Sequence, residues 1–297
     1  MGCSEVRLPE MRGPVGCDDA LKWRKIYGVS GLRLAVRTNS RRFSEEFGRV
    51  FRHFETYGDA QLVYSVVVGR EGHVLLRGEE VLYETGEYGE LVPALERLVE
   101  ARMVRALWDR PVFHAGVVAR DGVGVILPAE PGGGKTSLVT ALLELGFEYL
   151  SDEFAILDPE SMTVLPFPKA LCFKEEGMEL FPHLKPGSLR VEWDMGGRTG
   201  RLWYLDPSDL GFKVSGEVRK VSYVVFPERD GPEGAKVISK AKAALKLAEN
   251  LLNFEFFGRD VLDVVLNVVN RAECLHLRAG SPQDGAQVID DLLEEGG

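Results

Sequence analysis

Hydrophobic and polar residues alternate along several stretches in the first third of the chain. The segment GLRLAVRT, from Gly31, has this period of two, and QLVYSVVVGREGHVLLRGEEVLYET, from Gln61, predicts two or three strands. Helical spacing replaces the alternation in residues 44–54 and in LVPALERLVEARMVRALW, which starts at Leu91. These elements predict a small α+β leading domain over residues 1–108, with a role in partner recognition or structure.

The remaining chain, residues 109–297, alternates between strand-like and helix-like patterns. VFHAGVVARDGVGVIL contains two strand-like runs around Asp121-Gly122, a dipeptide that favours a tight hairpin. The later predicted elements are a helix after Lys135, strands in FEYLSDEFAILD, KVSYVVFPE and AECLHLRAG, a helix over 241–253, and a helix from Ser281. This alternation predicts an α/β fold with a mixed sheet.

The stretch AEPGGGKTS, residues 129–137, stands between the second strand-like run and the following helix. A strand, a glycine-rich loop, Lys-Thr and a helix form, in that order, a phosphate-binding P-loop. The N–H groups of a glycine loop can form a concave anion nest, and the positive end of the helix dipole points at the same place. The alternative interpretation is an ordinary glycine turn with an incidental lysine.

The residue types of this stretch match the parts of a nucleotide site. Lys135 would place its charge on the outer phosphates, and the hydroxyl of Thr136 would ligate Mg²⁺. Ala129 replaces the glycine that usually opens the motif. The predicted nucleotide-binding residues are Pro131, Gly132, Gly133, Gly134, Lys135, Thr136 and Ser137.

Two further features flank the glycine loop. The acidic pair Asp152-Glu153 follows one helix later, and His114 precedes the hairpin. Together with LLELGFEYLSDEFAILDPESMTVLPFPKALCFKEEG, this arrangement resembles the catalytic domain of HPr kinase/phosphorylase, in the branch of HPr-kinase-related kinases associated with peptide modification. The resemblance covers Val112 to about Phe226. It implies an HPr kinase/PEP carboxykinase-like fold, ATP and Mg²⁺ as cofactors, a homo-oligomer, and phosphorylation of a hydroxyl, most often a serine of a protein or ribosomally made peptide.

The resemblance also implies roles for individual residues. Asp152 would accept the proton of the substrate hydroxyl or hold that hydroxyl in line, and Glu153 would help to hold Mg²⁺. Adjacent strand residues point to opposite faces, so these two roles are exchangeable. His114 would pair with Asp152 or touch the transferred phosphate, the alternative being a histidine satisfied in the core.

Further candidates lie later in the chain. Arg198 and Arg201, in GGRTGRLWYL, would stabilise charge on the transferred phosphoryl group from a mobile loop, the alternative being an exposed turn. Lys174, after FPKALCF, is a candidate phosphate contact or a surface lysine. The aromatic residues of LLNFEFFGRD are expected to be core residues rather than pocket residues: Phe254, Phe256 and Phe257.

Composition narrows the class of partner. The 297 residues carry a net charge of −10 and are 45% hydrophobic, as expected for a globular protein that binds neither nucleic acid nor membrane. The four cysteines show no disulfide or zinc spacing, and the first residues show no signal peptide, which predicts a cytoplasmic protein. Two other functions stay open, namely a nucleotide-binding scaffold or switch without hydroxyl transfer, and a kinase of a free small molecule.

Overall fold

The computed structural model describes residues 21–29, 31–130, 132–158, 160–195, 198–228 and 234–295. It shows a mixed α/β protein. Within these ranges the chain forms seven α-helices and several mixed sheets. It divides into two compact units. The first comprises Met1–Ala101 and Val191–Arg201, and the second comprises Arg102–Arg190 and Leu202–Gly297.

The first unit is built on a six-stranded sheet in the order β3-β1-β2-β4-β5-β6. Its neighbouring strands are antiparallel except β2 and β4, which run parallel. The strands are β1 (Trp23–Val29), β2 (Leu32–Thr38), β3 (Glu55–Thr56), β4 (Leu62–Val68), β5 (His73–Arg77) and β6 (Glu80–Thr85).

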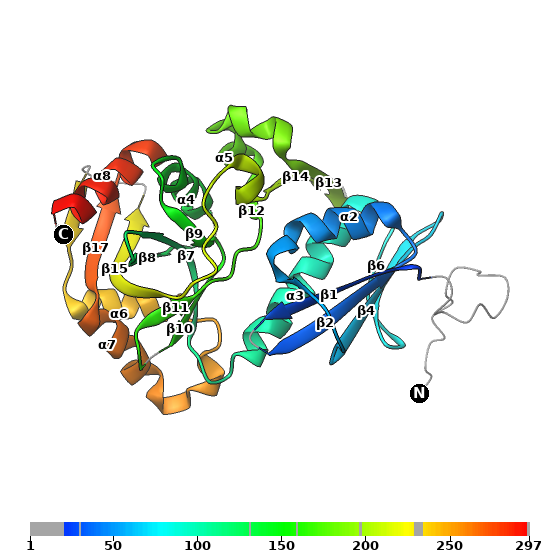
Figure 1. Ribbon diagram of the computed structural model, residues 1–297, viewed down its shortest axis with the longest axis horizontal. Coiled ribbons are helices and arrows are strands. Elements are labelled where there is room, and N and C mark those ends of the chain that lie inside the picture. The colour runs from blue at the N-terminus through cyan, green and yellow to red at the C-terminus, as the bar shows by residue number, and fades with distance from the viewer. Residues whose placement is uncertain are drawn as a thin grey trace. The chain divides into compact units, whose positions relative to one another are not determined.

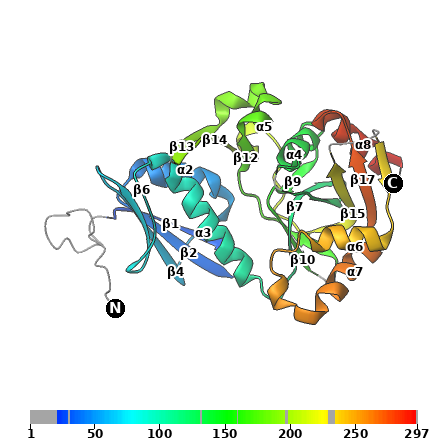
Figure 2. The same cartoon turned by 180° about the vertical axis from the view of Figure 1, so that it is seen from behind.

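Two helices, α2 (Arg41–Val50) and α3 (Leu91–Ala106), cover one face of this sheet. The rings of Phe47 on α2 and Tyr27 on β1 lie 5.6 Å apart, and the hydroxyl of Tyr64 on β4 donates to the carbonyl of Leu98 on α3. The strand register places Tyr27 and Tyr64 on the same sheet face, which Figure 2 shows behind α3. This aromatic face therefore forms the core of the first unit.

The second unit contains an eight-stranded sheet in the order β11-β10-β7-β8-β15-β17-β16, with β9 paired to β7. The strands β8, β15 and β17 run parallel, and the other pairs are antiparallel. The strands are β7 (Val112–Arg120), β8 (Val123–Pro128), β9 (Glu148–Ser151), β10 (Phe154–Asp158), β11 (Thr163–Leu165), β15 (Arg219–Glu228), β16 (Gly234–Val237) and β17 (Glu273–Arg278).

Helices lie on both faces of this sheet, with α4 (Lys135–Glu144) and α8 (Pro282–Glu295) on one side and α6 (Lys240–Ala248) and α7 (Val261–Arg271) on the other (Figure 1). Successive strand residues enter opposite layers: Val224 packs in the layer of α6 and α7, and Val225 in the layer of α4 and α8. Burial of both faces explains why these strands are almost entirely apolar.

A smaller three-stranded sheet has the order β12-β14-β13, from β12 (Leu171–Lys174), β14 (Arg198–Leu205) and β13 (Leu189–Met195). The short helix α5 (Glu175–Glu179) follows β12 directly. Gly177 lies close to β12, because a Cβ there would come 3.2 Å from Cδ1 of Phe173, and it is in ordinary contact range of the Ser137 hydroxyl on α4. The chain also has six 3₁₀ turns among the described residues, at Arg52–Phe54, Tyr88–Glu90, Pro182–Gly187, Pro207–Leu210, Phe254–Phe256 and Gly258–Asp260.

The structure differs from the sequence pattern at a few element boundaries. The helix predicted from residue 44 begins at Arg41, because the Ser40 hydroxyl accepts from the N–H of Phe43 and caps it. The helix predicted over 241–253 already ends at Ala248. Phe254 and Phe256, expected in the core, are largely exposed on the following 3₁₀ turn.

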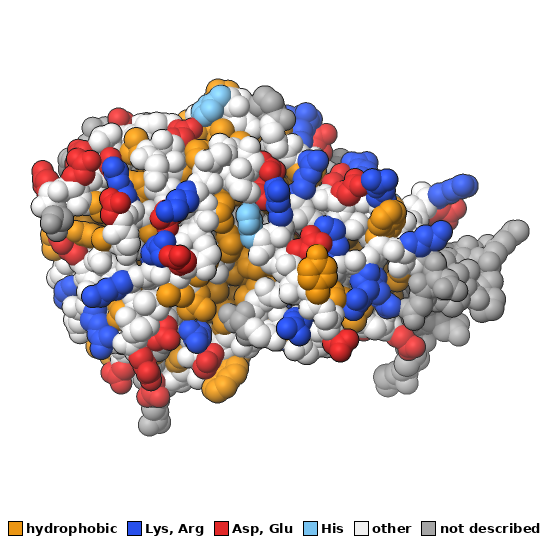
Figure 3. All heavy atoms as spheres, in the orientation of Figure 1, with side chains coloured by type: hydrophobic (Ala, Val, Ile, Leu, Met, Phe, Trp, Pro, Cys, Tyr) orange, Lys and Arg blue, Asp and Glu red, His pale blue; other side chains and the backbone are white. Residues whose placement is uncertain are grey.

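The surface carries both signs of charge. On the face drawn in Figure 3, Lys and Arg side chains are interspersed with Asp and Glu side chains and with apolar groups. None of the helices in the described ranges is both long enough and apolar enough to span a membrane.

Candidate active site

A glycine loop joins the end of β8 to the start of α4. A tight turn at Asp121 and Gly122, both with positive φ, pairs β8 with β7 and fixes the entry to the loop. Gly132 and Gly134 have φ of +83° and +85°, in the left-handed region that glycine adopts without strain. The N–H of Gly133 donates to the carbonyl of Glu130 at 2.9 Å, which closes the loop. Pro131 lies outside the described residues.

The first turn of α4 follows from this loop. Gly134 is its N-cap and has no side chain to accept from the first N–H groups of the helix. These N–H groups and the helix dipole therefore remain directed at whatever lies in front of the loop. Lys135 and Ser137 are buried in this turn, and Thr136 is half-buried.

The acidic pair sits at a break between two strands. Strand β9 ends at Ser151 and β10 begins at Phe154, with Asp152 and Glu153 between them. The Ser151 hydroxyl accepts from the N–H groups of Glu153 and Phe154 at 3.1 and 2.9 Å, which stabilises the turn. Because the strand is interrupted, the two adjacent carboxylates can face the same region.

The glycine loop, the acidic pair and His114 meet through side-chain contacts. Thr136 donates from Oγ1 to Oδ2 of Asp152 at 2.7 Å, and Lys135 donates from Nζ to the Asp152 carbonyl. Lys135 Nζ also lies 3.2 Å from Nε2 of His114. The same imidazole nitrogen lies 3.4 Å from Oε1 of Glu153. The sequence suggested that His114 pairs with Asp152, but the carboxylate beside it is that of Glu153.

Asp152 is buried and incompletely satisfied. Its Oδ1 is buried and has no hydrogen-bond partner among the described groups. Burial, reinforced by the nearby charge of Glu153, raises the pKa of Asp152 from 3.8 to about 6, although Lys135 and the Thr136 hydrogen bond oppose this. A buried carboxylate with a raised pKa and a free oxygen is characteristic of functional sites.

Glu153 has the opposite electrostatic environment. Burial by itself raises its pKa, but the hydrogen bond with His114 and the positive charges of Lys169 and Lys135 outweigh burial and lower it to about 2. The two adjacent carboxyl groups therefore differ in their affinity for a proton. Different proton affinities suit two carboxylates to different tasks.

Lys169 is a member of the cluster that the sequence reasoning missed. It precedes β12, its side chain is 4% exposed, and its Nζ lies 3.9 Å from Oε2 of Glu153. Lys174, the lysine singled out from the same segment, is exposed at the end of β12. The available signal was the position of Lys169 inside the apolar run LPFPKALCF, where a charged side chain needs a buried partner.

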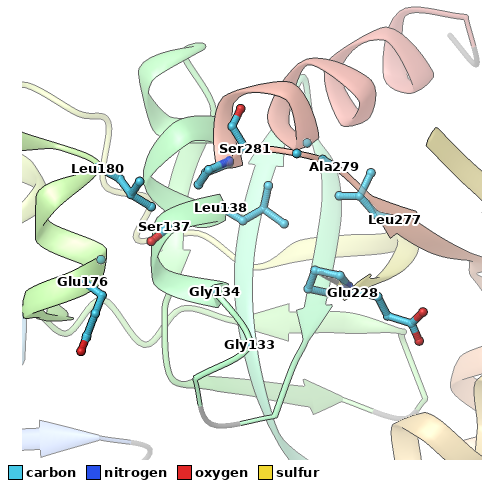
Figure 4. Close-up of a pocket in the computed structure, with 15 residues that line it drawn as sticks. Gly133, Gly134, Ser137, Leu138, Glu176, Leu180, Glu228, Leu277, Ala279 and Ser281 are labelled. Carbon is cyan, nitrogen blue, oxygen red and sulfur yellow. The ribbon is translucent and has the colours of Figure 1, made fainter. Parts of the chain in front are cut away.

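A pocket of about 470 Å³ opens beside the glycine loop. Figure 4 shows Leu138 and Leu277 at its centre, with Gly133 and Gly134 below and Ser281 at the start of α8 above. The loop after β8, the end of β15 and the loop after β17 all contribute to it. These are the carboxyl ends of parallel strands, where open α/β sheets bind ligands.

The two arginine candidates lie on β14, not on the elements that carry the glycine loop and the acidic pair. Arg201 lies on β14, in the first unit, and forms an exposed ion pair with Glu192 at 2.8 Å. Arg198 begins β14, and its side chain lies outside what the structure describes. Their proposed role in charge stabilisation stays a prediction.

Comparisons with known proteins add little to this geometry. No protein-family model matches the chain, and no curated protein matches it in sequence. Among solved structures, the chain is similar to the Hpr(Ser) kinase/phosphatase from Coxiella burnetii, with 14% identity, a TM-score of 0.32, and coverage of 63% of this chain and 99% of that chain. A similarity this low carries no argument about function, which is therefore argued from the site itself.

Proposed function

We propose that this protein is an ATP- and Mg²⁺-dependent kinase that transfers the γ-phosphate to a hydroxyl group. One observation carries the proposal. Lys135 and Thr136, in the first turn of α4 after the glycine loop, both donate hydrogen bonds to Asp152, which lies between β9 and β10. A single side chain, that of Thr136, therefore connects the proposed anion-binding loop to a buried carboxylate. Phosphoryl transfer needs this pairing of phosphate binding and acceptor positioning.

The nucleotide lies with its phosphates on the loop. The N–H groups of Gly132 and Gly134 and the start of α4 hold phosphate oxygens, while the Gly133 N–H keeps its bond to the Glu130 carbonyl. Lys135 neutralises the outer phosphates. The apolar pocket around Leu138 and Leu277 receives the nucleoside. This places the two ends of the nucleotide on adjacent elements of the same sheet edge.

The donor set fits magnesium. Mg²⁺ prefers oxygen ligands and takes only one or two carboxylates beside phosphates and water. The Thr136 hydroxyl donates a hydrogen bond to Asp152, which leaves the lone pairs of the Thr136 oxygen for a cation. Glu153 is held ionised by the basic groups around it. We assign Thr136 and Glu153 to the metal, which supplies charge neutralisation when bound.

Asp152 serves the acceptor. Its Oδ1, which has no partner among the described groups, accepts a hydrogen bond from the substrate hydroxyl and takes its proton as the oxygen attacks phosphorus. The raised pKa of Asp152 makes the carboxylate a stronger base for this proton. His114, beside both Lys135 and Glu153, orients these two groups and contacts the transferred phosphoryl group. The oxygen–phosphorus bond to the acceptor forms as the bond to the ADP leaving group breaks, and Lys135 stabilises the charge that moves onto ADP.

The acceptor class comes from the resemblance of the sequence to HPr-kinase-related kinases. That resemblance favours a serine of a protein or of a ribosomally made peptide. A nucleotide-binding scaffold without transfer uses the same loop but has no need for a carboxylate of raised pKa at its end. The position of Asp152 therefore favours the kinase.

Incubation with γ-labelled ATP, Mg²⁺ and a panel of serine-containing peptides tests the proposal. The wild type is expected to transfer label to a peptide serine. Asp152→Asn is expected to transfer none. Tight ATP binding without label on any peptide supports the scaffold, and label on a small hydroxyl compound supports a small-molecule kinase. A fully active Asp152→Asn variant contradicts the assignment of that carboxylate.

A further inference from the structure

Lys169 is held in the cluster by its backbone as well as by its charge. The hydroxyl of Tyr149, on β9, donates to the Lys169 carbonyl at 2.6 Å. The Lys169 N–H donates to the carbonyl of Phe167 at 2.8 Å, and the Phe167 N–H donates to that of Leu150 at the same distance. Tyr149 and Phe167 are fully buried, so the main chain at Lys169 is fixed to the strand that leads into Asp152.

Two lysines share one carboxylate oxygen in this cluster. The Nζ atoms of Lys135 and Lys169 each lie 3.9 Å from Oε2 of Glu153. Lys135 stands at the start of α4, beside the glycine loop, and Lys169 stands on a segment that is hydrogen-bonded to β9. Lys135 therefore belongs to the proposed phosphate site, whereas Lys169 does not.

Nucleotide binding changes the environment of Glu153. An ammonium group that turns to phosphate oxygens gives up contacts elsewhere, so Lys135 moves away from Glu153 when it binds the phosphates. The phosphates also bring negative charge, which repels a carboxylate that has lost a cationic neighbour. Lys169, whose main chain is bonded to β9 and not to the glycine loop, stays beside Oε2.

We propose that Lys169 is a positioning residue that holds the Glu153 carboxylate in the active site when Lys135 is engaged by the phosphates. This inference rests on the proposed function, because it assigns to Lys169 the task of keeping Glu153 available to Mg²⁺ and His114. Lys169 touches neither phosphate nor acceptor in this account and acts through Glu153.

The test compares Lys169→Met, which keeps the length of the side chain without its charge, with Lys169→Arg, which keeps the charge. Lys236→Met, on the exposed part of β16, is the matched control. A fluorescent ATP analogue is titrated in EDTA and at a series of Mg²⁺ concentrations, and kcat and KM are measured on the peptide that the wild type labels. Thermal unfolding of each variant reports on folding.

For Lys169→Met, nucleotide affinity in EDTA is expected to stay within about threefold of wild type. The Mg²⁺ concentration for half-maximal binding is expected to rise about 10–100-fold, with a similar fall in kcat and little change in KM, the range seen when partners of metal ligands are removed. Lys169→Arg is expected to keep most of the wild-type Mg²⁺ dependence and kcat. Lys236→Met is expected to match the wild type in both.

Wild-type Mg²⁺ dependence in Lys169→Met overturns the inference. An equal loss in the Met and Arg variants, with an equal fall in unfolding temperature, also overturns it, because the role is then structural. A wild type that binds Mg²⁺ and nucleotide but transfers nothing overturns the kinase function alone, and the titration still decides the role of Lys169. A wild type that binds no nucleotide overturns both.

Discussion

Thr136 donates a hydrogen bond of 2.7 Å from Oγ1 to Oδ2 of Asp152. This bond connects the first turn of α4 with the break between β9 and β10, two elements that serve different halves of the proposed reaction. A hydroxyl that ligates a cation must still donate its proton to an acceptor, and Asp152 is that acceptor. The helix start after the glycine loop and the Asp152 carboxylate are therefore coupled directly.

Replacing Asp152 by Asn is expected to stabilise the fold at neutral pH while removing activity. A carboxyl group with a higher pKa in the folded state than in the unfolded chain stabilises the fold when protonated, and this contribution is lost as pH rises from 3.8 through about 6. A shift of this size corresponds to a penalty of about 3 kcal/mol above pH 6. The Asn side chain carries no charge and escapes the penalty.

Urea unfolding at several pH values measures this effect. Asp152→Asn is expected to exceed the wild type by about 2–3 kcal/mol at pH 7–8, with the difference vanishing below about pH 4. A stability difference that is the same at pH 3.5 and pH 7.5 would show that ionisation of Asp152 is not its cause. ATP binding is expected to persist while transfer is lost.

Gly132→Ala and Gly146→Ala form a matched pair that separates backbone strain from phosphate binding. Both glycines have positive φ, +83° and +92°, and open space where a Cβ would stand. Each substitution is expected to destabilise the fold by about 1–2 kcal/mol. Only Gly132→Ala is expected to weaken ATP binding, by tenfold or more in calorimetry, because only Gly132 belongs to the loop. Equal nucleotide affinity in the two variants contradicts the loop assignment.

Asn253→Ala is expected to destabilise the second unit strongly. The Asn253 side chain is fully buried, accepts from the N–H of Val112, and donates to the carbonyls of Leu107 and Arg110. Losing these bonds leaves backbone groups buried without partners, at a cost of about 3 kcal/mol. Because Val112 starts the strand that carries His114, transfer is expected to fall as well.

Asn39→Ala is the control for that prediction. Asn39 also bonds the backbone twice, through the N–H and the carbonyl of Val68, but it is exposed, so water replaces the lost bonds. Chemical denaturation is expected to show a loss below about 1 kcal/mol for Asn39→Ala. Comparable losses in both variants would mean that burial does not decide the contribution of Asn253.

Much of the second unit follows from local sequence. The hairpin at Asp121-Gly122 and the helix start at Ser281 form where their residue types predict, because turn geometry and helix capping depend on neighbouring residues only. The break at Asp152-Glu153 also fits the need for two adjacent carboxylates to face one region. The mixed α/β class is confirmed in the same way, from the alternation of strands and helices.

The residues that sequence reasoning missed act over long distances in the chain. Asn253 bonds backbone groups more than 140 residues away, and Lys169 lies beside Glu153, which stands at the break between β9 and β10. A buried lysine and a surface lysine look alike in one sequence, since burial is decided by the packing of distant elements. The resemblance to HPr-kinase-related kinases singled out Lys174 in this segment, although the structure leaves it exposed.

Lys135→Met tests the cation that the account places on the phosphates. Its ammonium group has contacts to Asp152, His114 and Glu153, and no other described residue of the loop carries a positive charge. ATP affinity is expected to fall at least tenfold, and kcat about 10²–10³-fold, as for the loss of one electrostatic stabiliser of a transition state. Lys236→Met is again the control, and unchanged binding in Lys135→Met contradicts the role.

A structure determined with a non-hydrolysable ATP analogue and Mg²⁺, after calorimetry has established saturation, tests the central claim most directly. The account predicts phosphate oxygens within hydrogen-bond distance of the N–H groups of Gly132, Gly134 and Lys135, with the Lys135 ammonium moved from the Asp152 carbonyl onto the outer phosphates. Phosphates bound elsewhere, with Lys135 still bonded to that carbonyl, would contradict it.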